Sequence, residues 1–235
     1  MANGKFKLLE SFRKTFEGRV YKHRDPTVGN KIGRYFFEDM LDHSVSARYT
    51  HHVASRLGVV SIHGKVQTPR DIRRNDSVFG IPPAGAVLRE ASGFRVIEGP
   101  VAEPRIGCEV KIVAKSQQKQ IDRVINDLEG FARRMKRLNR RCINLAVVGV
   151  NHESDYVGHE GARSFRHALK AQESAKVEQK LRERLIDVYD ELLLLSFRAT
   201  NQPPYPFHWL NPIEVDVAYG AALTRVGAQY QSRFR

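Results

Sequence analysis

The chain has 235 residues, and 41% of them are hydrophobic, which is enough for a folded core in one large domain or two small ones. Lys and Arg number 39 against 26 Asp and Glu, so the formal net charge is +13. Because this surplus is spread along the chain, it favours a polyanionic partner, above all nucleic acid. No apolar run is long enough to span a membrane and no secretory h-region is present, so we expect a cytoplasmic protein without a membrane partner.

Two cysteines, Cys108 and Cys142, occur in the chain, and both lie in apolar runs. Their spacing does not match the cysteine pairs of a zinc site. We therefore expect them to be small buried thiols in a reducing compartment.

Two helical stretches are predicted near the start of the chain. Apolar residues at helical spacing indicate a short amphipathic helix over residues 5–16, and a second, mostly helical stretch covers residues 28–54. Glu38 lies within reach of the apolar stripe of the second stretch. It is either an ordinary exposed helix acid or an auxiliary ligand that reaches a metal ion from this helix.

Strand and turn signals follow. Residues 59–66 read as a strand, and residues 68–76 read as a basic loop. The loop has three arginines that either contact phosphate or are simply solvated: Arg70, Arg73 and Arg74. Residues 80–86 are rich in Gly and Pro and indicate a turn-rich connection.

A hairpin is predicted around Ser92-Gly93, between strands over residues 87–91 and 94–98. Gly99-Pro100 ends the second of these strands. Because the next strand follows after a short connection, the two neighbours are expected to run antiparallel.

The stretch from Pro104 to Lys115 alternates as a strand with two different faces. One face is apolar and can enter a core: Ile106, Cys108, Val110, Ile112 and Ala114. The other face is charged: Glu109, Lys111 and Lys115. A carboxylate and an ammonium group two residues apart on a largely buried strand are costly unless something needs them. A divalent cation together with a phosphodiester would need both, the carboxylate to bind the metal and the lysine to hold the attacking water or the scissile phosphate.

Residues 117–138 form the clearest helix, with a broad apolar stripe. Cations crowd its C-terminal end, where they suit the helix dipole and can also contact DNA. The expected contacts from this region are Lys115, Arg133 and Arg137. Residues 143–150 are almost continuously apolar, which suits a strand buried on both faces. The order of elements predicts an α/β fold in which helices flank a central mixed β-sheet.

The last part of the sequence is predicted to be mainly helical. Apolar residues over 177–197 indicate a long amphipathic helix, residues 202–209 form an aromatic-rich loop, and a final helix surrounds residues 219–230. The expected organisation has three parts: a basic N-terminal arm or helix (1–27), an α/β core (28–150) and a helical C-terminal extension packed on the core (151–235).

This pattern resembles the PD-(D/E)XK nuclease superfamily, which includes many restriction endonucleases. Glu109-Val110-Lys111 on a strand, the hairpin before it, and the helix and buried strand after it carry the resemblance, which covers roughly residues 28–150. The resemblance implies a restriction endonuclease-like core and hydrolysis of phosphodiester bonds in DNA with Mg²⁺ or Mn²⁺. It implies that Glu109 is the second acidic metal ligand and that Lys111 is the catalytic lysine.

The first acidic ligand departs from the superfamily pattern. The superfamily usually has an Asp, often after Pro, before this strand, but no Asp lies between Asp76 and Glu109. We select Glu98, at the polar end of the predicted hairpin strand, as the first catalytic and metal-binding acid. Glu103 and Asp76 are the alternatives.

Two auxiliary residues are suggested by the same resemblance. Glu38 matches the helix-borne acid of some superfamily members, and Gln118 or Gln120 could orient water or phosphate. Duplex DNA is the expected partner and restriction or phage defence the expected setting, with dimerisation if both strands are cut. The alternatives are a non-catalytic nucleic-acid-binding protein with a degenerate nuclease core, and an assembly protein that uses its C-terminal helices as an interface.

Overall fold

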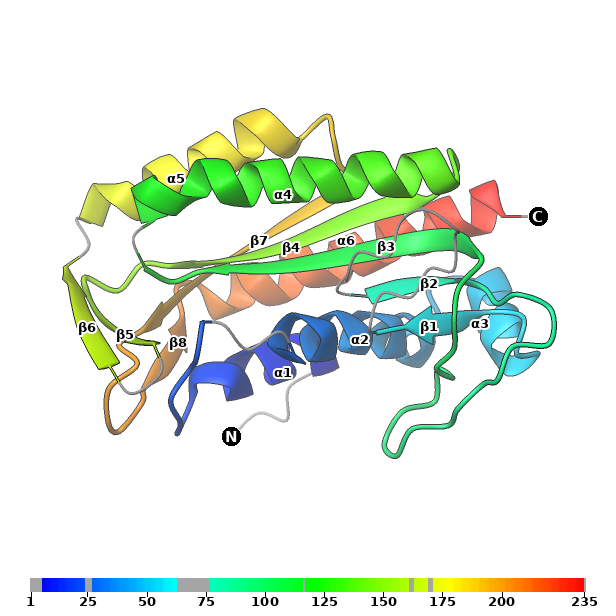
Figure 1. The fold of residues 1–235 in the computed structure, drawn as a ribbon, viewed down its shortest axis with the longest axis horizontal. Helices are drawn as coiled ribbons and strands as arrows, with labels where there is room; N and C mark the ends of the chain where they lie inside the picture. The colour runs from blue at the N-terminus through cyan, green and yellow to red at the C-terminus, as the bar shows by residue number, and fades with distance from the viewer. Residues whose placement is uncertain are drawn as a thin grey trace.

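A mixed six-stranded β-sheet runs through the middle of the molecule (Figure 1). The computed structural model describes residues 6–23, 27–62, 77–115, 117–160, 163–168 and 171–234. The strands of the sheet, in spatial order, are β1 (Val59–Ser61), β2 (Ser77–Ile81), β3 (Glu103–Val113), β4 (Ile143–Asn151), β7 (Glu191–Ala199) and β8 (Phe207–Trp209). β3, β4 and β7 are parallel, and the other pairings are antiparallel. The predicted α/β fold with a central mixed sheet is confirmed.

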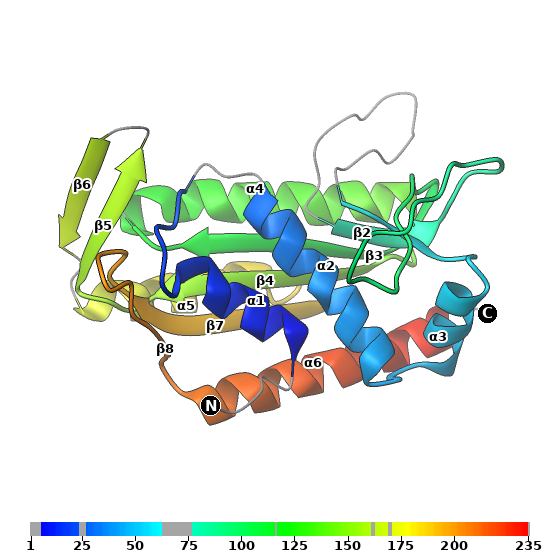
Figure 2. The same cartoon turned by 90° about the horizontal axis from the view of Figure 1, so that it is seen from below.

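Helices cover both faces of this sheet (Figures 1 and 2). α4 and α5 lie on one face, and α1, α2 and α6 lie on the other, with the short α3 beside α6. The helices are α1 (Lys7–Phe16), α2 (Thr27–Asp42), α3 (Ala47–Ala54), α4 (Gln117–Leu138), α5 (Ala171–Leu185) and α6 (Pro212–Arg233). A separate hairpin of β5 (Asp155–Glu160) and β6 (Arg163–Ala168) stands at one end of the molecule. No helix in the described part of the chain combines the length and apolarity needed to cross a membrane.

β3 has the two faces that its alternation predicts. Its even-numbered residues from Ile106 to Ile112, and Ala114 directly after the strand, belong to the core beneath α1, α2 and α6. Gly107 lies on the opposite face, where a Cβ atom would come 2.9 Å from Met135 and 3.0 Å from Phe131 of α4. Because only glycine leaves room there, α4 packs closely on β3 two residues before Glu109.

β4 is the centre of the sheet. All nine of its residues are buried, and it pairs in parallel with β3 on one edge and with β7 on the other. Its apolar residues alternate between the two cores, with Leu145 and Val147 on one face and Ala146 and Val148 on the other. The prediction of a strand buried on both faces is therefore confirmed.

The prediction of one long helix over residues 177–197 is wrong. α5 ends at Leu185, and β7 begins at Glu191. The four consecutive leucines at 192–195 fit a helix and a buried strand equally well, and parallel pairing with β4 decides between them. The segment 151–235 therefore adds two strands to the central sheet besides its helices.

The hairpin predicted around Ser92-Gly93 is reduced to one bridge, between Arg89 and Glu98. The antiparallel neighbour of β3 is instead β2, whose end overlaps the stretch predicted as a turn-rich connection. Gly80 reads as a turn signal but serves close strand packing, because a Cβ atom there would come 2.1 Å from the carbonyl oxygen of Glu103. The register shifts at the same point, as is typical of a bulge.

One buried carboxylate holds three helices together on the α1 side of the sheet. Asp39 of α2 accepts hydrogen bonds from the backbone N–H groups of Lys7 and Leu8 at 2.8 and 2.9 Å. It also accepts one from the hydroxyl of Tyr219 of α6 at 2.7 Å. The first N–H groups of a helix have no partner within the helix, so Asp39 satisfies two of those of α1.

His52 of α3 contacts β3 and α6 through its Nδ1 atom. This atom lies 3.0 Å from Nη1 of Arg105 and 2.8 Å from the hydroxyl of Tyr230. Because a guanidinium can only donate, Nδ1 must accept and the ring must be neutral. Burial, helped by the charge of Arg105 and more weakly by His51 and Arg48, lowers the pKa of His52 to about 4.

This depressed pKa predicts a pH dependence of stability. The unfolded chain, in which the imidazole has its ordinary pKa, binds a proton before the folded chain does. The contribution of His52 is therefore complete above about pH 6.5 and is lost as the pH falls toward 4. We expect urea unfolding at pH 7 and pH 4.5 to show a smaller loss of unfolding free energy in His52→Gln than in wild type. His208→Gln, which replaces an exposed histidine of β8, should keep the wild-type loss; equal losses in His52→Gln and wild type would contradict the prediction.

Candidate functional site

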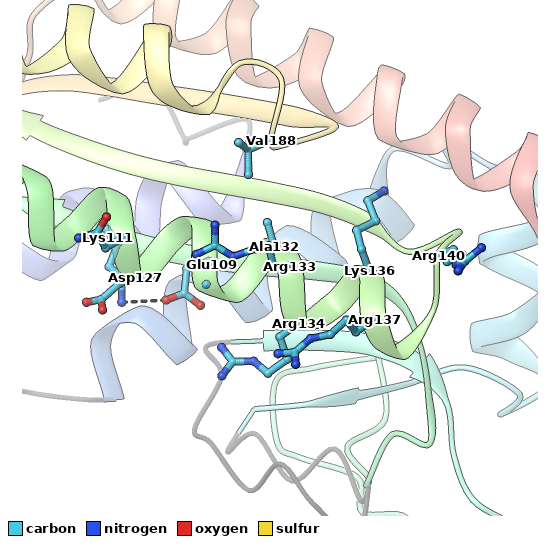
Figure 3. A pocket seen from close by; sticks show the side chains of 12 residues that line it. Glu109, Lys111, Asp127, Ala132, Arg133, Arg134, Lys136, Arg137, Arg140 and Val188 are labelled. Atoms are coloured by element: carbon cyan, nitrogen blue, oxygen red, sulfur yellow. Dashed lines mark ion pairs between the residues drawn. The ribbon is translucent and has the colours of Figure 1, made fainter.

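Glu109 and Lys111 form an ion pair on the face of β3 that α4 covers (Figure 3). Lys111 Nζ lies 2.8 Å from Glu109 Oε1, and the two side chains are 29% and 9% exposed. Taking a carboxylate out of water is costly unless a cation or a hydrogen-bond donor compensates for it, and Lys111 does so. The side-by-side placement predicted from their spacing is confirmed.

A groove of about 1440 Å³ lies beside this pair, along α4; we call it the α4 groove. Its cationic lining residues are Lys111, Arg133, Arg134, Lys136, Arg137 and Arg140. The carboxylates of the described chain that line it are those of Glu109 and Asp127. The groove is therefore strongly cationic, with its acids restricted to positions beside Lys111 and on α4 (Figure 3).

The amphipathic pattern of α4 explains why its cations face the groove. The apolar stripe is buried against β3 and β4: Ile121, Ile125, Leu128, Phe131 and Met135. The opposite side of the helix must then face solvent, and its C-terminal half carries most of the arginines. Positive charge at this end also complements the helix dipole, so it costs the fold little.

The cations of the groove differ in how far they are already neutralised. Lys136 is committed to the fold, since it pairs with Asp190 at 2.8 Å and donates to the carbonyl of Cys142. Arg133 pairs with Glu129 at 3.4 Å within the helix. Arg134 and Arg137 have no ion pair with any carboxylate of the described residues. These two guanidinium groups are therefore available to an anionic ligand.

Glu98 lies far from Glu109. Its backbone bridges to Val60 of β1, and its carboxylate pairs with Arg34 of α2. β1 and β2 lie between the backbone of Glu98 and β3. Glu98 is therefore three strand spacings, or about 14 Å, away from β3. The structure therefore does not bring together the two acids that the sequence paired, because the hairpin expected to deliver Glu98 packs against β1.

Glu38 is neither an exposed helix acid nor part of the α4 groove. It is fully buried and accepts hydrogen bonds from the backbone N–H groups of Arg95 and Val96 at 3.0 and 2.8 Å. It belongs to α2, on the face of the sheet opposite α4. Its observed contacts hold the loop before β3 and provide no route to Glu109.

The remaining residues that the sequence predicted for the site lie in different parts of the chain. Glu103 is 53% exposed at the start of β3, about 20 Å from Glu109 by the strand rise, and lies near Arg105. Lys115 is nearly buried beneath β5, where a Cβ on Gly158 would come 3.2 Å from its Nζ. Gln118 is in the first turn of α4, but its side chain lies outside the description. Four residues lie outside the described residues: Arg70, Arg73, Arg74 and Asp76.

Sequence reasoning missed Asp127, and it included Arg134 only among the cations at the end of this helix that can contact DNA. On α4 both look like ordinary residues of a polar helix face, and only the crossing of α4 over β3 brings them to the groove of Glu109. The signal that could have found them is their helical phase, opposite the apolar stripe. In the part of the chain that the structure describes, no three His, Cys, Asp or Glu residues converge as a metal-binding cluster.

Comparison with known proteins gives no family for this chain: no family model and no curated protein matches it. The residues of the α4 groove are therefore the basis for assigning a function.

Proposed function

We propose that this chain is a metal-dependent endonuclease that hydrolyses phosphodiester bonds of DNA, as in restriction or phage defence. The observation that supports this most is the Glu109–Lys111 pair, whose carboxylate is nearly buried, beside a groove whose arginines Arg134 and Arg137 are not neutralised within the described chain. A carboxylate, a lysine and unpaired guanidinium groups in one groove are the groups that metal-assisted attack on a phosphodiester requires.

The order of elements also supports the proposal. Three antiparallel strands, β1 to β3, are followed by the crossover helix α4 and the parallel strand β4. The Glu-x-Lys motif lies on the third of these strands, and the helix and buried strand that are part of the resemblance to the nuclease superfamily follow it. Since fold resemblance alone does not imply function, the argument depends on the chemistry of the groove.

The carboxylates of the groove fit a hard divalent cation. Mg²⁺ usually binds one or two protein carboxylates and completes its shell with water and substrate phosphate. Glu109 would hold the ion, and Asp127 is the second groove carboxylate of the described residues. When bound, Mg²⁺ or Mn²⁺ neutralises phosphate charge and lowers the pKa of a water molecule. Lys111 adds positive charge where the oxyanion develops, and Arg134 and Arg137 hold the DNA backbone in register.

A second candidate function is nucleic-acid binding without catalysis. The position of Glu98, paired with Arg34 and remote from Glu109, favours it. So does the lack of a three-residue metal cluster within the described ranges. In that case the Glu109–Lys111 pair belongs to a degenerate nuclease core without catalytic activity, and the cationic groove retains its affinity for phosphate.

Incubation of the wild-type chain with duplex DNA separates the two candidates. The nuclease proposal expects cleavage with Mg²⁺ or Mn²⁺ that EDTA stops. Salt-sensitive binding without cleavage under any divalent ion would support the second candidate instead. A gel shift that detects no DNA binding at physiological salt would contradict both.

The arginines of the groove give a quantitative prediction. In Arg134→Gln/Arg137→Gln we expect weaker DNA binding and a shallower salt dependence, because each lost phosphate contact lowers the slope of log K against log salt by about 0.9. Fluorescence anisotropy over a salt series measures both quantities. Arg123→Gln is the matched control, since this exposed arginine lies on the same helix but outside the groove. A slope that changes equally in the control and the double variant would contradict the prediction.

A further inference from the structure

Gly130 occupies the middle of the 22-residue helix α4, and it lines the α4 groove. A glycine inside a helix destabilises it relative to alanine, so its presence needs a reason. Packing supplies that reason for other helical glycines. A Cβ atom would come 2.8 Å from Ser77 at Gly33, 3.3 Å from Phe6 at Gly220, and 2.5 Å from Val45 at Gly227.

No such packing reason holds for Gly130. Apart from its two chain neighbours and the backbone of its own helix within four residues, a Cβ atom built there meets no described atom within 4 Å, so the fold leaves room for a side chain. The room belongs to the groove that Glu109 and Lys111 also line. Phe131, the next residue, packs on Gly107, which keeps this turn of α4 close to the part of β3 that carries Glu109.

The neighbours of Gly130 on the helix show what the open space faces. Asp127 lies about one turn before it, Arg134 about one turn after it and Arg137 about two turns after it, all lining the groove. With a rise of 1.5 Å per residue, the two arginines lie about 6 and 10 Å farther along the helix axis. A line of unpaired positive charge therefore leads away from Gly130.

We propose that Gly130 is a DNA-binding contact at which the sugar-phosphate backbone of a DNA strand passes against the helix backbone, before it continues along Arg134 and Arg137. The inference rests on the proposed function only in its choice of ligand. The absent side chain lets a strand approach the helix beside Glu109, and a larger residue would fill that part of the groove. The cost of the glycine to the helix is then offset by access to the groove.

Substitutions that add bulk at this position test the inference. Gly130→Ala should unfold at the same or a higher temperature than wild type, because alanine favours the helix. DNA affinity, measured by anisotropy without divalent metal, should fall a few-fold in Gly130→Ala and by about tenfold or more in Gly130→Leu. Ala228→Leu, which adds bulk to an exposed position of α6, should keep wild-type affinity.

The outcomes separate this inference from the proposed function. Wild-type affinity in a folded Gly130→Leu would overturn the role of Gly130 while leaving the nuclease proposal intact. Wild-type protein that binds DNA but never cleaves it would contradict the nuclease proposal. The test of Gly130 would remain valid, because it measures DNA binding and not cleavage. If Gly130→Leu does not fold, Gly130→Ala decides, because alanine fits the helix and unchanged affinity in that variant would then overturn the inference.

Discussion

Glu109→Gln is expected to lower the rate of metal-dependent DNA cleavage by about 10³-fold while DNA binding persists. The amide keeps the shape of the side chain but loses the charge that would hold a divalent cation next to Lys111. Single-turnover cleavage at saturating protein isolates the chemical step from binding. Glu214→Gln, an exposed acid of α6, is the matched control and should cleave as wild type does.

Folding must be measured in the same variant, because Gln leaves the half-buried Lys111 without its carboxylate partner. A thermal unfolding midpoint close to that of wild type, together with retained DNA binding, shows that lost cleavage is chemical in origin. Full activity in both Glu109→Gln and Lys111→Ala would end the nuclease proposal, because the proposal assigns the metal to the first residue and oxyanion stabilisation to the second.

The same assay tests which acid binds the metal together with Glu109. Asp127→Asn is expected to reduce cleavage because Asp127 lines the groove of Glu109, whereas Glu98→Gln should retain it because that carboxylate is paired with Arg34. Asp76→Asn completes the series for an acid outside the described residues. Loss of cleavage in Glu98→Gln with normal folding would contradict the placement of the site.

Asp39→Ala is expected to lower the free energy of unfolding by about 3–5 kcal/mol. The variant removes the acceptor for two backbone N–H groups of α1 and for the buried hydroxyl of Tyr219, and each unsatisfied buried donor costs about 1–3 kcal/mol. Burial raises the pKa of Asp39, so the cost of keeping its charge offsets part of what the hydrogen bonds contribute. Against a typical total of about 5–15 kcal/mol, the loss would be large.

Urea unfolding of matched variants checks this expectation. Tyr219→Phe removes one donor with the bond it makes and should cost about 1–2 kcal/mol, while Asp216→Ala, an exposed acid on α6, should stay within about 0.5 kcal/mol of wild type. A loss below about 1 kcal/mol in Asp39→Ala would show that α1 is held by its apolar face alone.

The elements predicted most closely are those with one strong local pattern. α4 has the predicted bounds, and the two faces of β3 are as expected. In each stretch the apolar residues fit only one pattern, helical spacing in α4 and strict alternation in β3. The leucine run at 192–195 satisfies both periods, so only its neighbour β4 could decide its conformation. Gly80 likewise reads as a turn until the close approach of β3 is known.

The candidate site was likewise predictable only where its residues lie on one element. Glu109 and Lys111 are two residues apart on one strand, so their contact follows from strand geometry. Asp127 and Arg134 reach the groove only because a helix crosses the strand, and no local pattern reports such a crossing. Glu98 was misplaced for the converse reason, since closeness in sequence to β3 did not make it a spatial neighbour.

The central position of β4 has a consequence for biosynthesis. Its second edge stays unpaired until β7, more than forty positions later in the sequence, has been translated. Tyr219, which completes the set of donors to Asp39, is made later still. A nascent chain must therefore expose an apolar strand edge for a few seconds of synthesis, a period in which that edge can pair with another chain.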